Sequence, residues 1–191
     1  MKMRKNSKNY QNSASDKNLG FGLIEAMIVL MILAIAAAIA VPLMVGSFGR
    51  ARSEVYMDRV RAALELGRIT AMSESISVFL CPTANGSSCN TAVTAANWGN
   101  NRLLLFTSSA GNSTEVDRII SIVEAPEAGD YISSTNGINV RFRPNGLSAT
   151  ALTLRYCSVV DDQGANRFIR TIVINIIGRI TSNVEGGSQS C

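Results

Sequence analysis

Few residues in this 191-residue chain have the chemistry of a catalyst. The sequence has no histidine, which removes Ser-His-Asp and Cys-His catalysis and histidine-containing zinc sites, because no other side chain supplies a neutral imidazole. It also has no Gly-rich phosphate loop, no nucleophile elbow and no Ser-x-x-Lys motif, and no lysine follows Lys17. Asp161 and Asp162 are adjacent acids in an expected turn, where carboxylates are usually solvated. We therefore expect neither an enzyme nor a bound cofactor.

One acid, Glu25, lies in an otherwise apolar segment. It is followed by Ala26–Val45 (AMIVLMILAIAAAIAVPLMV), twenty residues without a charge, a length that crosses roughly 30 Å of hydrocarbon as a helix. A carboxylate in hydrocarbon costs roughly 2.5–3.5 kcal/mol even on forgiving insertion scales. A carboxylate retained at this place therefore needs a cation to meet it.

The residues ahead of this segment are basic. Residues 1–20 carry a net charge of +4, and the other 13 basic residues of the chain, all arginine, are matched by 13 acids. The basic leader predicts a cytoplasmic N-terminus, and the sequence pI near 9.1 says nothing about nucleic acid. A secretory signal peptide with a cleavage site at Ala38-Ile39-Ala40 and a simple membrane anchor are the plain interpretations. Glu25 argues against both.

The start of the segment resembles the class III signal of type IV pilins and type II secretion pseudopilins. A basic leader ends in Gly20, and Phe21 opens an apolar stretch with Glu25 at its fifth position. The resemblance implies that a prepilin peptidase cuts between Gly20 and Phe21 and methylates Phe21. In the filament, the cleaved N-terminal amine of a neighbouring subunit would supply the cation for Glu25. Pro42 matches a family proline that loosens the helix by removing a hydrogen-bond donor.

Beyond Pro42 the pattern stays helical but becomes amphipathic. Small and apolar residues recur at spacings of three or four, which predicts one buried helix face; they are Tyr56, Val60, Ala63, Leu64, Gly67 and Ala71. We predict one helix from Phe21 to about Ser73, with two helices broken at 42–46 as the alternative. The predicted organisation is a leader at 1–20, a transmembrane or filament-core helix half at 21–46, and a globular domain at 47–191 that includes the amphipathic half.

The rest of the chain reads as strands and turns. Six segments are rich in branched and aromatic residues and bounded by Gly, Asn, Ser or Pro: Ile76–Cys81, Arg102–Thr107, Arg118–Val123, Ile138–Arg143, Ala151–Val159 and Phe168–Ile177. The last is apolar on both parities, which predicts a central strand. Turns are expected at Asn145-Gly146 and at 161–164. The predicted fold class is α+β, a long N-terminal helix packed against an antiparallel β-rich globular domain, and we expect its strands to form one sheet on the helix.

Four cysteines point to disulfides. An even count is typical of domains outside the cytoplasmic membrane, and the absence of a C-x-x-C pair argues against a tetrathiolate zinc site. Cys81 and Cys89 close a short loop, so proximity favours that pair. By elimination, Cys157 would bind Cys191 and hold the Gly- and Ser-rich tail. Two free thiols are the alternative.

The soluble half resembles the FimT/GspH family of minor pilins and pseudopilins. The matching segments span most of the chain: LELGRITAMSESISVFLC at 64–81, NWGNNRLLLF at 97–106, VRFRPNG at 140–146 and IVINIIGRI at 172–180. The resemblance implies a pilin-like fold and a low-abundance complex that initiates or caps a filament. It implies as partners other minor and major pilins, the prepilin peptidase, and the inner membrane before assembly, with the C-terminal domain outside the cytoplasm.

Some members of the family bind DNA during uptake. We expect a structural minor pilin, with a DNA-binding minor pilin or a type II secretion pseudopilin as alternatives. The DNA-binding members carry Gly-Arg-x-Arg near the C-terminus, and here Gly178 and Arg179 are present but Thr181 replaces the second arginine. Binding to DNA would therefore be weak. Arg179 would lead such a site, with support from Arg141, Arg143, Arg155 and Arg170 if these share its face.

Overall fold

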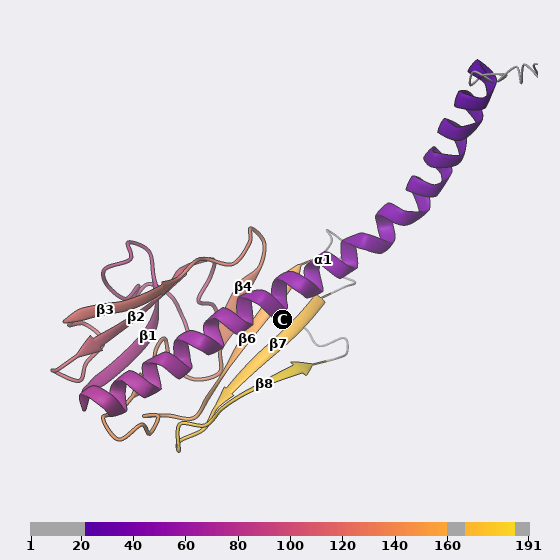
Figure 1. Ribbon diagram of the computed structural model, residues 1–191. Helices are drawn as coiled ribbons and strands as arrows, with labels where there is room; N and C mark the ends of the chain where they lie inside the picture. Colours follow the sequence, from indigo (N-terminus) through magenta and orange to yellow (C-terminus); the bar gives the residue numbers. More distant parts are fainter. Residues whose placement is uncertain (1–21, 160–166, 186–191) are drawn as a thin grey trace, which may run out of the picture. The chain divides into compact units, whose positions relative to one another are not determined.

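The computed structural model describes residues 22–159 and 167–185 (Figure 1). The chain divides into two units, Met1–Val41 and Pro42–Cys191. The helix α1, Leu23–Glu74, contributes to both units. The structure assigns it as one helix, so the alternative of two helices broken at 42–46 is not observed. The leader, Phe21 and the turn expected at 161–164 lie outside the described residues.

The end of α1 is defined by its backbone. Ser75 follows the last helical residue in a left-handed conformation, with φ of 53°. The N–H of Ile76 then donates to the carbonyl of Ala71 at 3.3 Å, which satisfies one of the free carbonyls of the last turn. The chain leaves the helix there, and the first strand begins two residues after Ser75.

Two antiparallel four-stranded sheets make up the rest of the second unit (Figure 1). The first has the order β3-β2-β1-β5 and the second the order β4-β6-β7-β8. The strands of the first sheet are β1 Ser77–Thr83, β2 Arg102–Ser108, β3 Arg118–Val123 and β5 Val140–Phe142. Those of the second are β4 Tyr131–Ser134, β6 Leu152–Val159, β7 Arg167–Ile174 and β8 Ile180–Glu185.

The main core lies between one face of α1 and the inner faces of both sheets. All six helix positions predicted to be buried are buried, and they join Val78, Leu105, Phe142, Leu154 and Ile172 from the strands. Gly67 allows the closest approach, because a Cβ at this position would lie 2.9 Å from Cδ1 of Leu105 and 3.3 Å from Cγ1 of Val78. Fully buried Trp98 closes the core, with its Nε1 donating to the carbonyl of Gly137 at 3.3 Å.

The predicted α+β fold, a long helix packed against antiparallel β-structure, is confirmed, but the strands form two sheets rather than the one sheet expected. The prediction missed β4 and β8, because both are short or polar edge strands (YISS and ITSNVE) without an apolar alternation. The predicted strand Phe168–Ile177 ends earlier, at Ile174. Ile176 and Ile177 lie instead in the turn to β8, where both are exposed. The turn at Asn145-Gly146 is confirmed, with Gly146 at φ of 75° and its N–H donating to the carbonyl of Arg143 at 2.8 Å.

Candidate functional site

The first half of α1 is a membrane-length apolar helix. Residues Leu23–Ala40 have a mean hydropathy of 2.7, and none of them is buried inside the structure. By length and composition this segment is able to cross a membrane. No residue in the described ranges, 22–159 and 167–185, buries these side chains.

Glu25 is in the first turn of this helix. Its N–H donates to the carbonyl of Gly22 at 3.0 Å, and its side chain is exposed. A carboxylate at a helix N-terminus is favoured by the helix dipole, and no cation pairs with Glu25 within the described ranges. Gly20 and Phe21 lie outside those ranges. Cleavage between them, methylation of Phe21 and the pairing of Glu25 all stay predictions.

A buried tyrosine pair ties the second half of α1 to the second sheet. The rings of Tyr56 and Tyr156 are stacked with centroids 5.1 Å apart. The hydroxyl of Tyr156 donates to Oδ2 of buried Asp130 at 2.6 Å. Burial raises the pKa of Tyr56, and burial followed by the hydrogen bond to Asp130 raises the pKa of Tyr156. Both hydroxyls are therefore neutral at physiological pH.

The disulfide between Cys81 and Cys89 is present, with a Cα–Cα distance of 5.6 Å. It fastens the residues that follow β1 over the outer face of the first sheet, where Cys81 packs with Phe79, Leu104 and Phe106. Cys157, on β6, is also disulfide-bonded. Its predicted partner, Cys191, lies outside the described residues, so the identity of this second bridge stays a prediction.

The five arginines proposed for DNA do not share one face. On β7, Arg170 opposes the core residue Tyr156 and donates to Oε2 of Glu54 at 3.0 Å. Arg155 precedes Tyr156 on β6 and so points to the opposite face of that sheet.

Arg141 belongs to the other sheet. Its guanidinium lies 5.4 Å from the ring centroid of Phe79 and donates to Oγ of Ser77 at 3.2 Å. Arg141, Arg155 and Arg170 are thus placed on three different surfaces. The condition that they support Arg179 from one face is not met.

Arg143 lies at the same end of the domain as Arg179. The turn after β5 meets the turn between β7 and β8, because the N–H of Ser148 donates to the carbonyl of Ile176 at 3.0 Å. A Cβ at Gly178 would lie 2.1 Å from the carbonyl oxygen of Gly146. The space beside Gly178 is therefore occupied by the backbone of Gly146 in the same chain. Exposed Arg179 follows directly.

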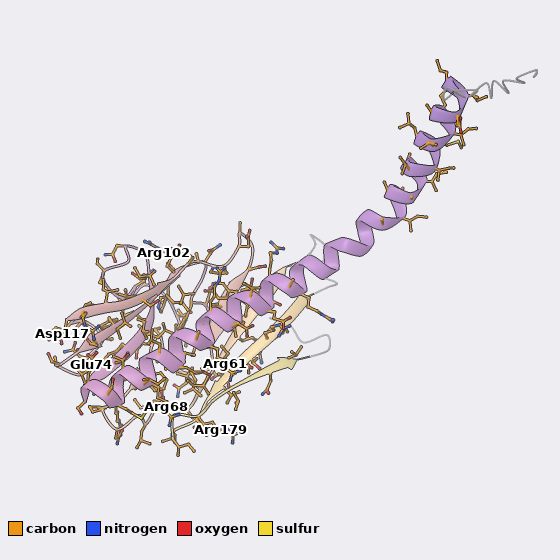
Figure 2. All side chains as sticks on the ribbon, in the orientation of Figure 1. Arg61, Arg68, Glu74, Arg102, Asp117 and Arg179 are labelled. Carbon is orange, nitrogen blue, oxygen red and sulfur yellow. A yellow bond between two sulfur atoms is a disulfide. The ribbon has the colours of Figure 1, made fainter. Side chains whose placement is uncertain are left out.

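Arg68 was missed by the sequence analysis. From α1, its Nε donates to the carbonyl of Gly146 at 3.1 Å and a terminal nitrogen donates to that of Ile177 at 3.4 Å. Figure 2 shows Arg68 and Arg179 at this same end of the domain. The partners are backbone atoms far away in the sequence, which leave no residue pattern to read. Among the described residues, no group of acids, cysteines or histidines could hold a metal ion.

A long helix with an apolar first half and a second half packed on two antiparallel sheets defines the class of pilin-like proteins. The family described as type II transport protein GspH matches residues 57–178, and the prokaryotic N-terminal methylation motif matches residues 15–41. The chain belongs to this GspH family of minor pilins and pseudopilins. The motif and the apolar helix together indicate membrane anchoring and incorporation into a pilus-type filament.

One solved structure supports this fold, and a second is reported beside it. The crystal structure of the type IV minor pilin FimU from Pseudomonas aeruginosa is 17% identical, covers 71% of this chain and 90% of its own, and has a TM-score of 0.50. The minor pseudopilin EpsH of the type 2 secretion system of Vibrio cholerae is 10% identical, covers 72% and 96%, and has a TM-score of 0.44. No curated protein matches the chain. Its relatives are structural pilins rather than enzymes, and membership implies interaction with other pilins.

Proposed function

We propose that the chain is a minor type IV pilin that helps to prime or cap the pilus and has no enzymatic activity. The observation that carries the proposal is the helix Leu23–Ala40, which is apolar except for Glu25 and has no residue buried inside the structure. A bilayer covers such a surface before assembly, and the helices of other pilins cover it afterwards. The domain supplies no catalytic constellation among its described residues.

The path to the filament follows from the two ends of this segment. The basic leader holds the N-terminus in the cytoplasm, which places residues 47–191 outside the inner membrane, where disulfides form. The prepilin peptidase cuts between Gly20 and Phe21 and methylates Phe21. The amine of a neighbouring subunit then meets Glu25, and this pair compensates the carboxylate's cost in an apolar filament core.

Deletion of the gene, with wild-type and Glu25→Ala complementation, tests this role. We expect surface pili recovered by shearing to fall on deletion, to return with the wild-type chain, and to stay low with Glu25→Ala. Normal pili together with lost protein secretion would assign the chain to a type II secretion system instead. Normal pili and normal secretion would overturn the proposal.

DNA binding is a second candidate because Arg68, Arg143 and Arg179 gather at one end of the domain. Two of these three cations are exposed and make no side-chain ion pair within the described ranges, namely Arg143 and Arg179. Each arginine contact to duplex phosphate adds about 0.9 to the slope of log affinity against log salt. A site with two or three contacts is therefore weak, independent of sequence, and lost at physiological salt.

Titration of the full-length chain with labelled duplex DNA at two salt concentrations tests this candidate. Arg179→Ala should abolish any low-salt binding, whereas Arg102→Ala, which changes an arginine on β2, serves as the matched control. Tight binding that persists at higher salt and disappears in Arg179→Ala would make DNA capture the main function.

A further inference from the structure

β3 forms one edge of the first sheet. β3 is the outermost strand of that sheet, opposite β5. Its sequence, RIISIV, has no proline, lysine or acid, and its one charged residue, Arg118, pairs with Glu74. The strand is irregular at Ile120, where its pairing with β2 shifts register, and it is regular over residues 121–123. By comparison, β5 has three residues, β4 has four, and β8 is mostly polar. β3 is therefore the most apolar of the four edge strands.

Beside this edge, α1 exposes a second apolar face. Val55, Ala62, Leu66 and Ile69 recur at helical spacing, and we name these four residues the outer stripe. Leu66 is 43% exposed and Ile69 is 59% exposed. The stripe is separate from the face that packs into the core, since the residues of that face are buried. An exposed stripe along a helix that already has a buried face needs its own partner.

Two hollows lie between the outer stripe and the segment that starts in β3. One, of about 360 Å³, is lined by Ala62 and Leu66 on the helix and by Ser121 to Glu124 on the other side. The second, of about 310 Å³, continues past Val55 and Tyr56 to Ala125 and Glu127. Arg59 lines both. We call these two adjoining hollows the groove: residues 121–123 of β3 line its first part, and side chains of α1 line both parts.

The charges of the groove are only partly matched. Arg52 and Glu127 pair across the second hollow at 3.7 Å. Arg59 and Glu124 both line the first hollow, yet neither makes an ion pair in the part of the chain that the structure describes. Bringing a segment over Arg59 would remove water from an unpaired guanidinium, and a carboxylate from that segment would offset the cost.

We propose that this groove receives an extended segment of another pilin, which adds to β3 as a fifth strand of the first sheet. This inference rests on the proposed role in a filament and names the surface that role would use. Backbone hydrogen bonds to β3 supply the pairing, and alternate side chains cover Leu66 and its neighbours in the outer stripe. The segment is apolar on that face and carries a carboxylate opposite Arg59.

The test uses the full-length chain, produced together with each of the other pilins of its own cell, which are tagged one at a time and purified in detergent. We expect one tagged pilin to recover the chain and Leu66→Glu to lower that recovery about tenfold or more, because a charge would be buried in the groove. Arg59→Glu should act in the same direction, and Arg59→Lys should be milder. Ile176→Glu, at a residue that is 61% exposed in the β7–β8 turn, is the matched control and should retain recovery.

Hydrogen exchange distinguishes a strand from a helix in the groove. In the purified complex, the amides of residues 118–123 should exchange more slowly than in the free chain. Unchanged exchange of those amides, or recovery of Leu66→Glu at the wild-type level, would overturn the proposal. So would a homodimer of the chain alone that protects the same amides, because the occupant would then be a second copy.

Failure of this inference is distinguishable from failure of the role in a filament. Unchanged melting of Leu66→Glu shows that the domain is folded, and only then is its recovery compared. If Leu66→Glu enters sheared pili normally while Glu25→Ala does not, the filament role stands and the fifth strand is rejected. If both enter normally, the filament role fails as well.

Discussion

In the first half of α1, Leu23–Ala40, no residue is buried by the chain, whereas in the second half Val60, Leu64 and Ala71 have no exposed surface at all. Both halves contain many apolar residues, but the first half has one charged residue, Glu25, whereas residues 50–74 have nine. The two halves also differ in periodicity: apart from Glu25 the first half is apolar on every face, and the second half alternates apolar and charged faces.

This difference assigns the two halves to different partners. An amphipathic face is covered by a domain on one side, and the sheets of the same chain provide that domain. A helix that is apolar all round is covered only by lipid or by other helices. The single acid of the first half, Glu25, then favours one kind of partner. Its carboxylate is costly to bury in lipid hydrocarbon, and a cation on a neighbouring helix offsets that cost.

Glu25→Ala addresses the first half directly and should have the largest effect. We expect cleavage to proceed, while recovery in sheared filaments falls nearly to background, because the amine of the neighbouring subunit loses its counter-charge. Glu25→Asp keeps the charge and should be milder. Gel mobility scores cleavage and filament recovery scores assembly, so the two steps are separated. Normal incorporation of Glu25→Ala would show that the carboxylate does not select partners.

A matched pair of leucines separates the halves by stability. Leu64→Ala removes a fully buried side chain and should cost about 2–5 kcal/mol of unfolding free energy, because it leaves a cavity between α1 and the sheets. Leu33→Ala, in the first half, should leave unfolding of the domain unchanged. Denaturant titration of both full-length variants in detergent measures the difference. Equal destabilisation would mean that the domain buries the first half as well.

Loss of the second disulfide, which involves Cys157, should affect the stability of the domain more than filament assembly. Cys157 is buried on β6, and loss of a native bridge in a small exported domain costs about 2–5 kcal/mol. We expect Cys157→Ser to lower the melting temperature while leaving cleavage intact. Non-reducing peptide mapping should recover Cys81–Cys89 and Cys157–Cys191. Labelling of free thiols in the unreduced wild-type chain would contradict the second pair.

The tyrosine pair in the second half should give the smallest effects, with opposite signs. The hydroxyl of Tyr56 is buried and has no hydrogen-bond partner among the described residues, so Tyr56→Phe should be neutral or should stabilise by up to about 1 kcal/mol. Tyr156→Phe removes the donor to Asp130 and should destabilise by about 1–2 kcal/mol. Thermal melting of the two variants side by side measures the contrast. Equal changes in melting temperature would show that the hydrogen bond from Tyr156 to Asp130 does not contribute to stability.

The buried tyrosine pair also predicts that the stability of the domain falls at alkaline pH. Since burial raises both pKa values in the folded state, the neutral tyrosines contribute stability fully below the unfolded pKa of about 10. That contribution is lost as the pH rises above it. Tyr156→Phe should flatten the decline. A decline of equal steepness in wild type and variant would assign it to other groups.

Sequence patterns predicted α1, its buried face and most strands of the two sheets, because each depends on local periodicity and turn residues. Gly67 and Leu64 were placed correctly by helical spacing alone. The division into two sheets was not predicted, since it depends on the polar edge strands β4 and β8. The Cys81–Cys89 pair followed from a short loop, whereas the dispersal of Arg141, Arg155 and Arg170 over different surfaces depends on which strands pair. Arg68 binds backbone carbonyls, and residue types in the sequence do not indicate which carbonyls will lie nearby.

Intact-mass measurement of the mature wild-type chain tests the division of α1 most directly, with Gly20→Val as its control. If the first half is made for a filament, the chain keeps that half and begins at an N-methylated Phe21. Gly20→Val should remain a full-length precursor in the membrane, because a side chain at this position obstructs close approach of the backbone to the peptidase. A mature chain that begins at Val41 would show that the first half of α1 is an ordinary signal peptide, removed before it could meet any partner.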